Sequence, residues 1–93
     1  MHFEIVSVGN ELLTGRTLNT NSQWLAYEIT SLGGFVRRIT TIRDDLNEIS
    51  STLKEALNRR TEWIIFTGGL GPTYDDMTLE GIAKALNLDI EVN

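Results

Sequence analysis

Two segments of the sequence have the composition of a phosphate-binding site. In residues 68–78, three glycines fall within four positions, at Gly68, Gly69 and Gly71. Glycines let backbone N–H groups approach an anion closely, and the start of a following helix adds positive partial charge. Residues 9–15 form a second segment that begins and ends with glycine. We therefore predict that both segments contact a phosphorylated small molecule.

Carboxylates accompany these glycines at Glu11, Asp75 and Asp76, and Asp44 lies in a third predicted loop. A carboxylate beside a phosphate repels it unless a cation lies between them, which predicts Mg²⁺ or a similar divalent ion. The same residues fit a second interpretation, in which the aspartates cap helices and the glycines only form a tight turn. Both interpretations stay open from spacing alone.

Several other chemistries are not supported. Neither a G-x-G-x-x-G motif nor a lysine-containing P-loop is present. No base lies near Ser7 or Thr67 in the sequence to activate a hydroxyl nucleophile. A flavodoxin-like or receiver-like domain is a weaker alternative, because a receiver needs a lysine at a later strand end and none occurs there.

These segments must be positioned by alternating strands and helices. Short stretches rich in β-branched and aromatic residues alternate with stretches in which apolar residues recur at helical spacing. The three predicted strands are residues 3–8, 35–41 and 63–67. Leu25, Ile29 and Leu32 define the apolar face of the first helix, and a third helix follows Asp76. We expect Trp24 and Trp63 to be buried in the core.

The expected ends of the helices agree with this division. Residues 19–21 offer caps for the first helix, and Gly33 with Gly34 can take the positive φ that ends it. Asp45 followed by Glu48 resembles a capping box for the second helix. Strands joined by helices run parallel with right-handed crossovers, so we predict a sheet that begins in the order 2-1-3. That order places residues 9–15 beside residues 68–78.

Composition limits the remaining possibilities. The chain has 93 residues, which we interpret as one domain, residues 1–93. No apolar run is long enough to span a bilayer, and the absence of cysteine fits a cytoplasmic location. With a net charge of −5 and no basic stripe, nucleic acid is not an expected partner.

Residues 67–78, TGGLGPTYDDMT, resemble the G-G-[TL]-G-P-x-x-x-D-x-T signature of the molybdopterin-binding (MoaB/MogA-like) domain family. Residues 10–21, NELLTGRTLNTN, resemble the N-E-L-L-x-G…N-T-N stretch of its competence/damage-inducible CinA-like members. The resemblance implies a three-layer α/β/α sandwich. It also implies that the chain binds molybdopterin or an adenine nucleotide with Mg²⁺, as in molybdenum cofactor biosynthesis or CinA-type ADP-ribose pyrophosphatase domains.

The resemblance assigns roles to individual residues. Asp44 and Asp76 match the acidic positions implicated in catalysis, and with Asp75 and Glu11 they form the predicted metal ligands. The predicted ligand-binding residues are Gly9, Asn10, Glu11, Gly15, Thr67, Gly68, Gly69, Gly71, Pro72, Thr73, Tyr74 and Thr78. An active enzyme of this kind would perform metal-dependent nucleotidyl transfer or pyrophosphate hydrolysis.

The family domain is longer than this chain, so the resemblance also implies that the chain is a truncated domain, the N-terminal part of the full family domain. The alternative function is therefore a catalytically inactive binding or oligomerisation module, in which the chain assembles with copies of itself. In that case the exposed edge of the third strand would need cover from another chain or segment.

Overall fold

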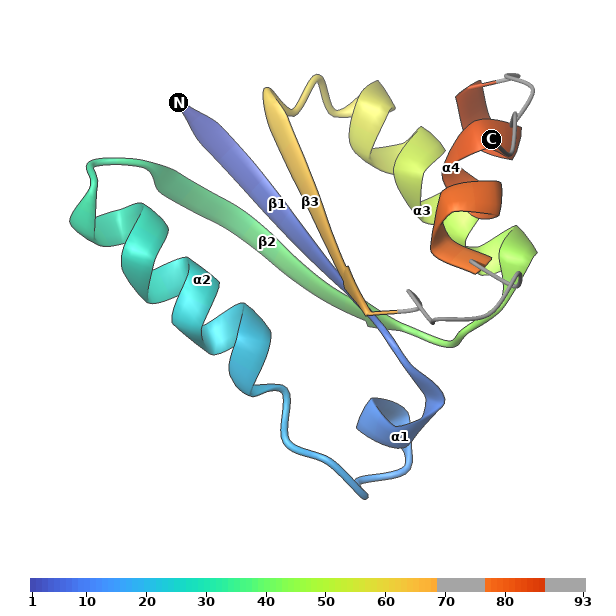
Figure 1. Cartoon of the computed structure of the whole chain (residues 1–93). Coiled ribbons are helices and arrows are strands. Elements are labelled where there is room, and N and C mark those ends of the chain that lie inside the picture. The colour runs from blue at the N-terminus through green and yellow to red at the C-terminus, as the bar shows by residue number, and fades with distance from the viewer. Residues whose placement is uncertain (69–76, 87–93) are drawn as a thin grey trace, which may run out of the picture.

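A computed structural model describes residues 1–68 and 77–86, excluding the side chains of residues 77–80. The strands are β1 (His2–Val8), β2 (Phe35–Ile42) and β3 (Trp63–Gly68). The helices are α1 (Asn10–Leu13), α2 (Thr20–Ser31), α3 (Leu46–Asn58) and α4 (Met77–Leu86) (Figure 1). All predicted strands and the three predicted helices are present. The short helix α1 lies where the sequence indicated only a loop.

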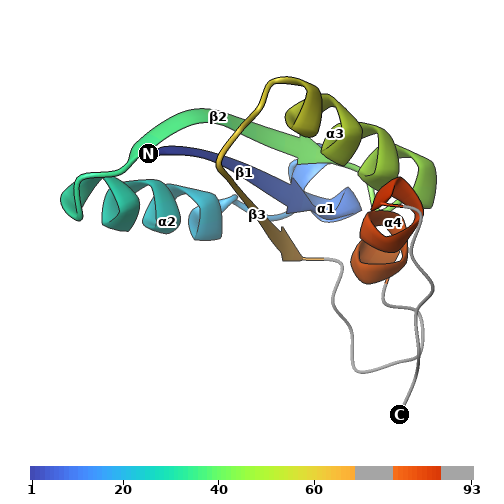
Figure 2. The same cartoon turned by 90° about the horizontal axis from the view of Figure 1, so that it is seen from above.

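The strands form one parallel sheet in the order β2-β1-β3, which confirms the predicted 2-1-3 arrangement. Helix α2 covers one face of the sheet, and α3 and α4 lie on the opposite face (Figure 2). The chain reverses its winding direction once, between the two crossovers, and this places helices on both faces. The result is the three-layer α/β/α sandwich that the family resemblance implied.

The core lies around the central strand. Ile5, Val6 and Val8 of β1 are almost completely buried, because neighbouring strands lie on both sides of β1 and helices lie over both faces. Val6 and Val8 pack with Ile42 of β2 and Ile49 of α3. A central parallel strand buried in this way needs a nearly continuous apolar run.

Helix ends form where local sequence signals indicated. The side chain of Asn19 accepts a hydrogen bond from the backbone N–H of Ser22 and caps α2. Gly33, with φ +92, ends that helix in a left-handed conformation. The carboxylate of Asp45 accepts the Glu48 N–H at 2.9 Å and caps α3. Caps of this kind satisfy N–H groups that have no partner within the helix.

The prediction that both tryptophans are buried is wrong. Trp24 keeps 61% and Trp63 keeps 53% of its surface exposed. Ile64 and Phe66 pack toward the α3 face, so alternation along β3 turns Trp63 to the α2 face, where α2 lies over β1 and β2 rather than β3. Leu32 was also expected on the buried face of α2, but it lies at the helix end and is 87% exposed.

A charged pair joins the sheet to the end of α3. Glu4 of β1 is only 1% exposed, and both of its carboxylate oxygens accept hydrogen bonds from Arg59, at 3.0 and 2.6 Å. The hydroxyl of Thr61 also donates to Glu4. Hydrogen bonding from Arg59 lowers the pKa of Glu4 against the opposing effect of burial. This bidentate pair keeps a carboxylate charged inside a largely buried strand.

We expect Arg59→Met to lower the free energy of unfolding by about 2–3 kcal/mol at neutral pH, because it leaves the buried Glu4 carboxylate without a cation. The pair stabilises the fold above the ordinary carboxylate pKa, and this contribution is lost as pH falls through the lowered pKa of Glu4. The difference in free energy of unfolding between the unaltered chain and the variant, measured with urea, should therefore become smaller at acidic pH. We call this difference the deficit of the variant. Arg60→Met is the control, since Arg60 is exposed. A deficit that stays constant from about pH 7 to about pH 3 contradicts this role.

Candidate functional site

Three hydroxyl side chains lie across the sheet, each one residue before the end of its strand. Ser7 of β1 is paired with Thr41 of β2 on one side and Thr67 of β3 on the other. The Thr67 hydroxyl donates to the Ser7 oxygen at 3.5 Å. Because the strands are parallel, this polar row marks the carboxyl end of the sheet, where open α/β sheets bind their ligands.

Asn19 connects this row to α2. Its Nδ2 donates to the Ser7 hydroxyl oxygen at 2.9 Å and to the Thr41 hydroxyl oxygen at 3.4 Å, while its Oδ1 caps the helix. One side chain therefore holds the start of α2 against two strand ends. The sequence indicated Asn19 as a cap but gave no sign of its contact with the sheet. The available signal was a hydroxyl residue, Ser7 or Thr41, at the carboxyl end of each predicted strand.

A cavity of about 140 Å³ lies next to these residues. It is bordered by Val8, Glu11, Leu12, Thr17, Leu18, Asn19, Thr20, Asn21, Thr67 and Gly68. Pockets that enclose a whole ligand usually measure about 300–1,000 Å³, so this cavity fits one phosphate-sized group. Three predicted site residues, Glu11, Thr67 and Gly68, are brought together here.

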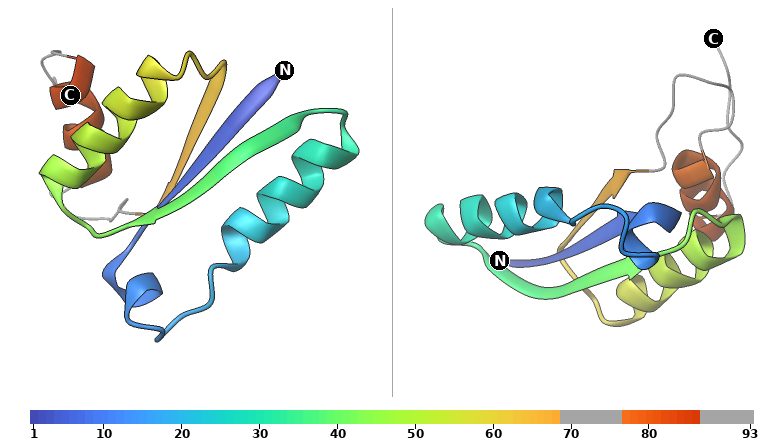
Figure 3. Two further views of the ribbon diagram at one scale, coloured as in Figure 1. Left: turned by 180° about the vertical axis from the view of Figure 1, so that it is seen from behind. Right: turned by 90° about the horizontal axis from the view of Figure 1, so that it is seen from below.

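Hydrogen bonds connect the segment after β1 to the segment after β2. The Gly9 N–H donates to the carbonyl of Ile42 at 3.0 Å, and the Asn10 side-chain oxygen accepts the Asp44 N–H at 3.0 Å. Asn10 thus positions the backbone of the acidic loop. Figure 3 shows α1 beyond the carboxyl end of the sheet, before the chain turns back into α2. Gly15 follows α1 with φ +77.

Asp44 and Glu11 border different cavities. Asp44 is exposed and lines a second cavity of about 410 Å³ with Asn10, Arg43, Asp45 and Glu48. Glu11 borders the smaller cavity beside Thr67. In residues 1–68 and 77–86, no group of three histidine, aspartate or glutamate side chains is placed to hold a metal ion. The described carboxylates therefore do not form a complete metal site by themselves.

Most of the glycine-rich segment lies outside the described residues. This applies to the predicted site residues Gly69, Gly71, Pro72, Thr73, Tyr74, Asp75 and Asp76. Thr78 lies in α4, and its side chain is outside the description. The start of the segment is placed, because Gly68 pairs with Val8, the residue before Gly9. The two segments that were predicted to converge therefore begin side by side.

A family model described as "Probable molybdopterin binding domain" matches residues 4–93. The chain belongs to this family. Membership in the molybdopterin-binding domain family indicates a small-molecule ligand and agrees with the resemblance in the glycine-rich segment. Within the described part of this family member, no helix has the length and apolar character to cross a membrane.

Curated relatives are similar over nearly the whole chain. A protein from Sulfurisphaera tokodaii is 61% identical over 90 residues, and one from Sulfolobus acidocaldarius is 58% identical over 90 residues. Each match covers 97% of this chain and 34% of the relative. This chain therefore spans about a third of the length of these curated relatives.

Solved structures share the fold. The protein CinA from Thermoplasma acidophilum, described as of unknown function, matches with a TM-score of 0.92 and 41% identity over 100% of this chain and 56% of its own. The molybdopterin biosynthesis enzyme MoaB from Thermus thermophilus matches with a TM-score of 0.80 and 19% identity, covering 89% of this chain and 53% of its own. The MoaB match concerns the fold alone.

We expect Gly68→Ala to destabilise the protein by at least about 2 kcal/mol, because it adds a steric clash to an unfavourable backbone conformation. Gly68 has φ +82, and an added Cβ would lie 2.1 Å from the carbonyl oxygen of Val8. Gly15→Ala is the matched control, since Gly15 has φ +77 but nothing within 4 Å of the added Cβ. The midpoint temperature of thermal unfolding should be clearly lower for Gly68→Ala than for Gly15→Ala. Equal losses for both would show that the close approach to β1 is unimportant.

Proposed function

We propose that this chain binds the phosphate of a molybdopterin-like or adenine-nucleotide ligand, together with Mg²⁺, at the carboxyl end of its sheet. The observation that carries the proposal is the meeting of Glu11, Thr67 and Gly68 at one cavity beside Asn19. Membership in the molybdopterin-binding domain family supports a pterin-type ligand. The adenine nucleotide rests on the resemblance of residues 10–21 to CinA-like members, and the metal rests on the carboxylates near the site.

The donors around the cavity suit a phosphate group. The Thr67 hydroxyl and the Asn19 amide are neutral donors, and they bond to the Ser7 oxygen within the described structure. A phosphate oxygen is a stronger acceptor than a hydroxyl, because hydrogen bonds to ionised groups are shorter and stronger. Binding would therefore redirect Thr67 toward the ligand while Asn19 keeps α2 capped. Backbone N–H groups at Gly69 and Gly71 are the further donors in this proposal.

The carboxylates fit Mg²⁺ in donor chemistry. Mg²⁺ is usually held by one or two protein carboxylates, with substrate phosphate oxygens and waters completing its shell. Asp44 suits this role, because its carboxylate is exposed and forms no hydrogen bond or ion pair with the other described residues. Glu11 would contribute from the other cavity, and Asp75 and Asp76 are proposed as the remaining ligands. When bound, the ion would supply positive charge against the phosphate and help to position it.

The reaction class that follows is nucleotidyl transfer or pyrophosphate hydrolysis, with Asp44 and Asp76 as the proposed catalytic residues. The chain's contribution would be to position the phosphate with fixed donors and to exclude water from one side of it. A second candidate function, ligand binding without turnover, is supported by the coverage of the relatives. The chain spans 34% of the Sulfurisphaera tokodaii protein, so residues that complete a reaction there can lie outside the match.

Titration calorimetry with ATP and with ADP-ribose, each with and without Mg²⁺, tests the binding proposal. We expect Mg²⁺ to strengthen nucleotide binding. Asp44→Asn should reduce this Mg²⁺-dependent increase in affinity by about tenfold, because asparagine has the shape of aspartate but no negative charge. Asp76→Asn should act in the same direction. Mass analysis of the nucleotide after incubation separates binding from turnover.

Glu48→Gln is the matched control for Asp44→Asn. Glu48 borders the same cavity and loses the same charge, but it lies within the first turn of α3. The affinity of the Glu48→Gln chain for ATP and Mg²⁺ should stay close to that of the unaltered chain. Unchanged Mg²⁺ dependence in both aspartate variants would remove the metal from the proposal, and no binding of either nucleotide would remove the adenine ligand.

A further inference from the structure

The small cavity beside Asn19 is too small for a whole ligand. It measures about 140 Å³, which suits one phosphate group. The ligand of the proposed function also carries a purine or pterin ring, and this ring needs a place of its own. A cavity on the other side of α1 meets that need.

Helix α1 presents different side chains to its two sides. Asn10, Leu13 and Thr14, the C-cap of α1, are spaced i, i+3 and i+4 and therefore lie on one side of this helical turn. Together with Arg43 they border a cavity of about 340 Å³, which we call the α1 cavity. Glu11 borders the small cavity instead. The volume of the α1 cavity lies within the usual range for ligand pockets, about 300–1,000 Å³.

Arg43 is the cation of the α1 cavity. It directly follows β2, and hydrogen bonds hold the backbone on both sides of it: the Ile42 carbonyl accepts the Gly9 N–H, and the Asp44 N–H donates to the side-chain oxygen of Asn10. The Arg43 guanidinium forms no hydrogen bond or ion pair with the other residues that the structure describes. An arginine with an anchored backbone and an unpaired guanidinium is available to a ligand.

The side chains around the α1 cavity suit a planar nitrogen-containing ring. The guanidinium of Arg43 is planar and stacks on aromatic rings, and Leu13, which is 51% exposed, supplies apolar surface. The amide nitrogen of Asn10 has no hydrogen-bond partner among the described residues. The Thr14 hydroxyl donates to the carbonyl of Glu11, so its oxygen can still accept. These two groups can bond to the nitrogen and oxygen atoms at the edge of a ring.

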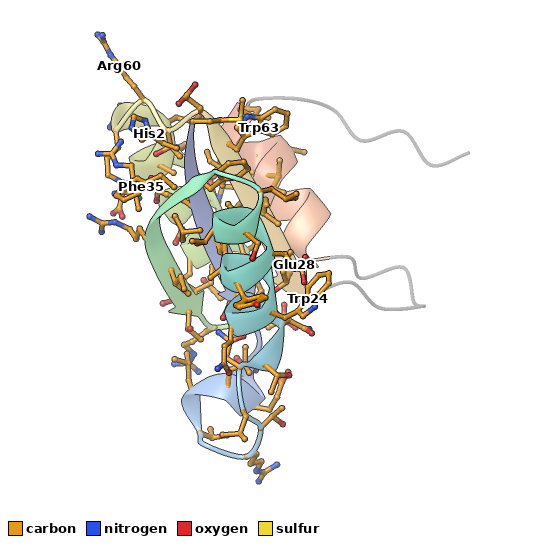
Figure 4. The ribbon with its side chains drawn as sticks, turned by 90° about the vertical axis from the view of Figure 1, so that its left-hand side faces the viewer. His2, Trp24, Glu28, Phe35, Arg60 and Trp63 are labelled. Carbon is orange, nitrogen blue, oxygen red and sulfur yellow. The ribbon has the colours of Figure 1, made fainter. Side chains whose placement is uncertain are left out.

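Two larger cavities suit the ring less well. The cavity that contains Asp44 is bordered by three carboxylates, which favour a cation over an aromatic ring. An apolar cavity of about 430 Å³ lies beside Met1 and Phe3, at the amino end of β1. Figure 4 shows His2 and Trp63 at that end of the molecule, opposite α1. A ring bound there would lie far from a phosphate at the carboxyl end of the sheet.

We propose that the α1 cavity binds the purine or pterin ring of the ligand, with the ring stacked on the Arg43 guanidinium and in contact with Leu13. The class of ring rests on the proposed function, whereas the place of the ring rests on the side chains that border the cavity. Asn10 and Arg43 also border the cavity that contains Asp44. A ligand whose phosphate is held by a cation at Asp44 can therefore place its ring in the adjacent α1 cavity.

The first test uses ring compounds without phosphate, so that it does not depend on phosphate or Mg²⁺ binding. Adenosine and neopterin are each titrated into the 93-residue chain while methyl NMR resonances are followed. We expect a saturable shift of the Leu13 methyl resonances, and the compound that binds more tightly identifies the ring as purine or pterin. The methyl resonances of Leu32, which borders the apolar cavity at the opposite end, should not shift. No saturable shift at Leu13 with either compound overturns the proposal.

Arg43→Lys tests the stacking contact. Lysine keeps the charge but lacks the planar group, so the variant should bind the ring compound about fivefold more weakly. Leu13→Ala should also weaken binding, because it removes apolar surface from the cavity. Unchanged affinity in both variants overturns the proposal.

Arg16→Lys and Leu57→Ala are the matched controls. Arg16 is exposed and lies shortly after α1, and Leu57 is 45% exposed on α3, but neither borders the α1 cavity. Both variants should bind the ring compound with the affinity of the unaltered chain. Circular dichroism should show an intact fold in all four variants.

Tripolyphosphate separates a ring contact from a phosphate contact at Arg43. With Mg²⁺ present, Arg43→Lys should lower the affinity for ATP about fivefold and leave the affinity for tripolyphosphate unchanged, because lysine keeps the positive charge. An equal loss of affinity for both compounds would assign Arg43 to phosphate and overturn the proposal. If neither ATP nor tripolyphosphate binds, the proposed function is wrong, and the titrations with adenosine and neopterin still decide whether the α1 cavity binds a ring.

Discussion

The pairing of β1 with a strand on each side is the constraint from which the rest of this structure follows. Since both neighbours are parallel to β1, all three strands end together, and Ser7 lies between Thr41 and Thr67. The pairing continues past the strand through the Gly9 N–H and the Ile42 carbonyl. The segments that hold Glu11 and Asp44 are therefore anchored to one strand, and a ligand bound at this end would meet groups from all three strands.

The two halves of β1 have different physical roles. At its amino half, Glu4 and Arg59 form a charge-assisted pair that joins the sheet to the end of α3. At its carboxyl end, Ser7 belongs to a neutral cluster held by Asn19. A neutral cluster can exchange hydrogen bonds with an incoming phosphate, whereas breaking the buried ion pair would leave an uncompensated charge. In the proposed function, ligand binding would therefore depend on the end of β1 opposite to the one that holds the ion pair.

The candidate site is divided by α1. Glu11 borders the cavity next to β3, whereas Asp44 borders a separate cavity with Asn10 and Arg43. In the proposed function, a phosphorylated ligand with a cation would join these two sides. Strand β3 ends in this region, since Gly68 lies at the smaller cavity.

Local patterns in the sequence determined the strands, the crossover helices, the 2-1-3 order and the caps at Asn19, Gly33 and Asp45, because periodicity and capping act within a few residues. They also indicated that the two glycine segments begin side by side. Only the tertiary structure decided that Trp24 and Trp63 are exposed, that Asn19 reaches across two strands, and that Glu11 and Asp44 border separate cavities. These features depend on which helix covers which strand and on contacts between residues far apart in the chain, and neither is encoded in the spacing of neighbouring residues.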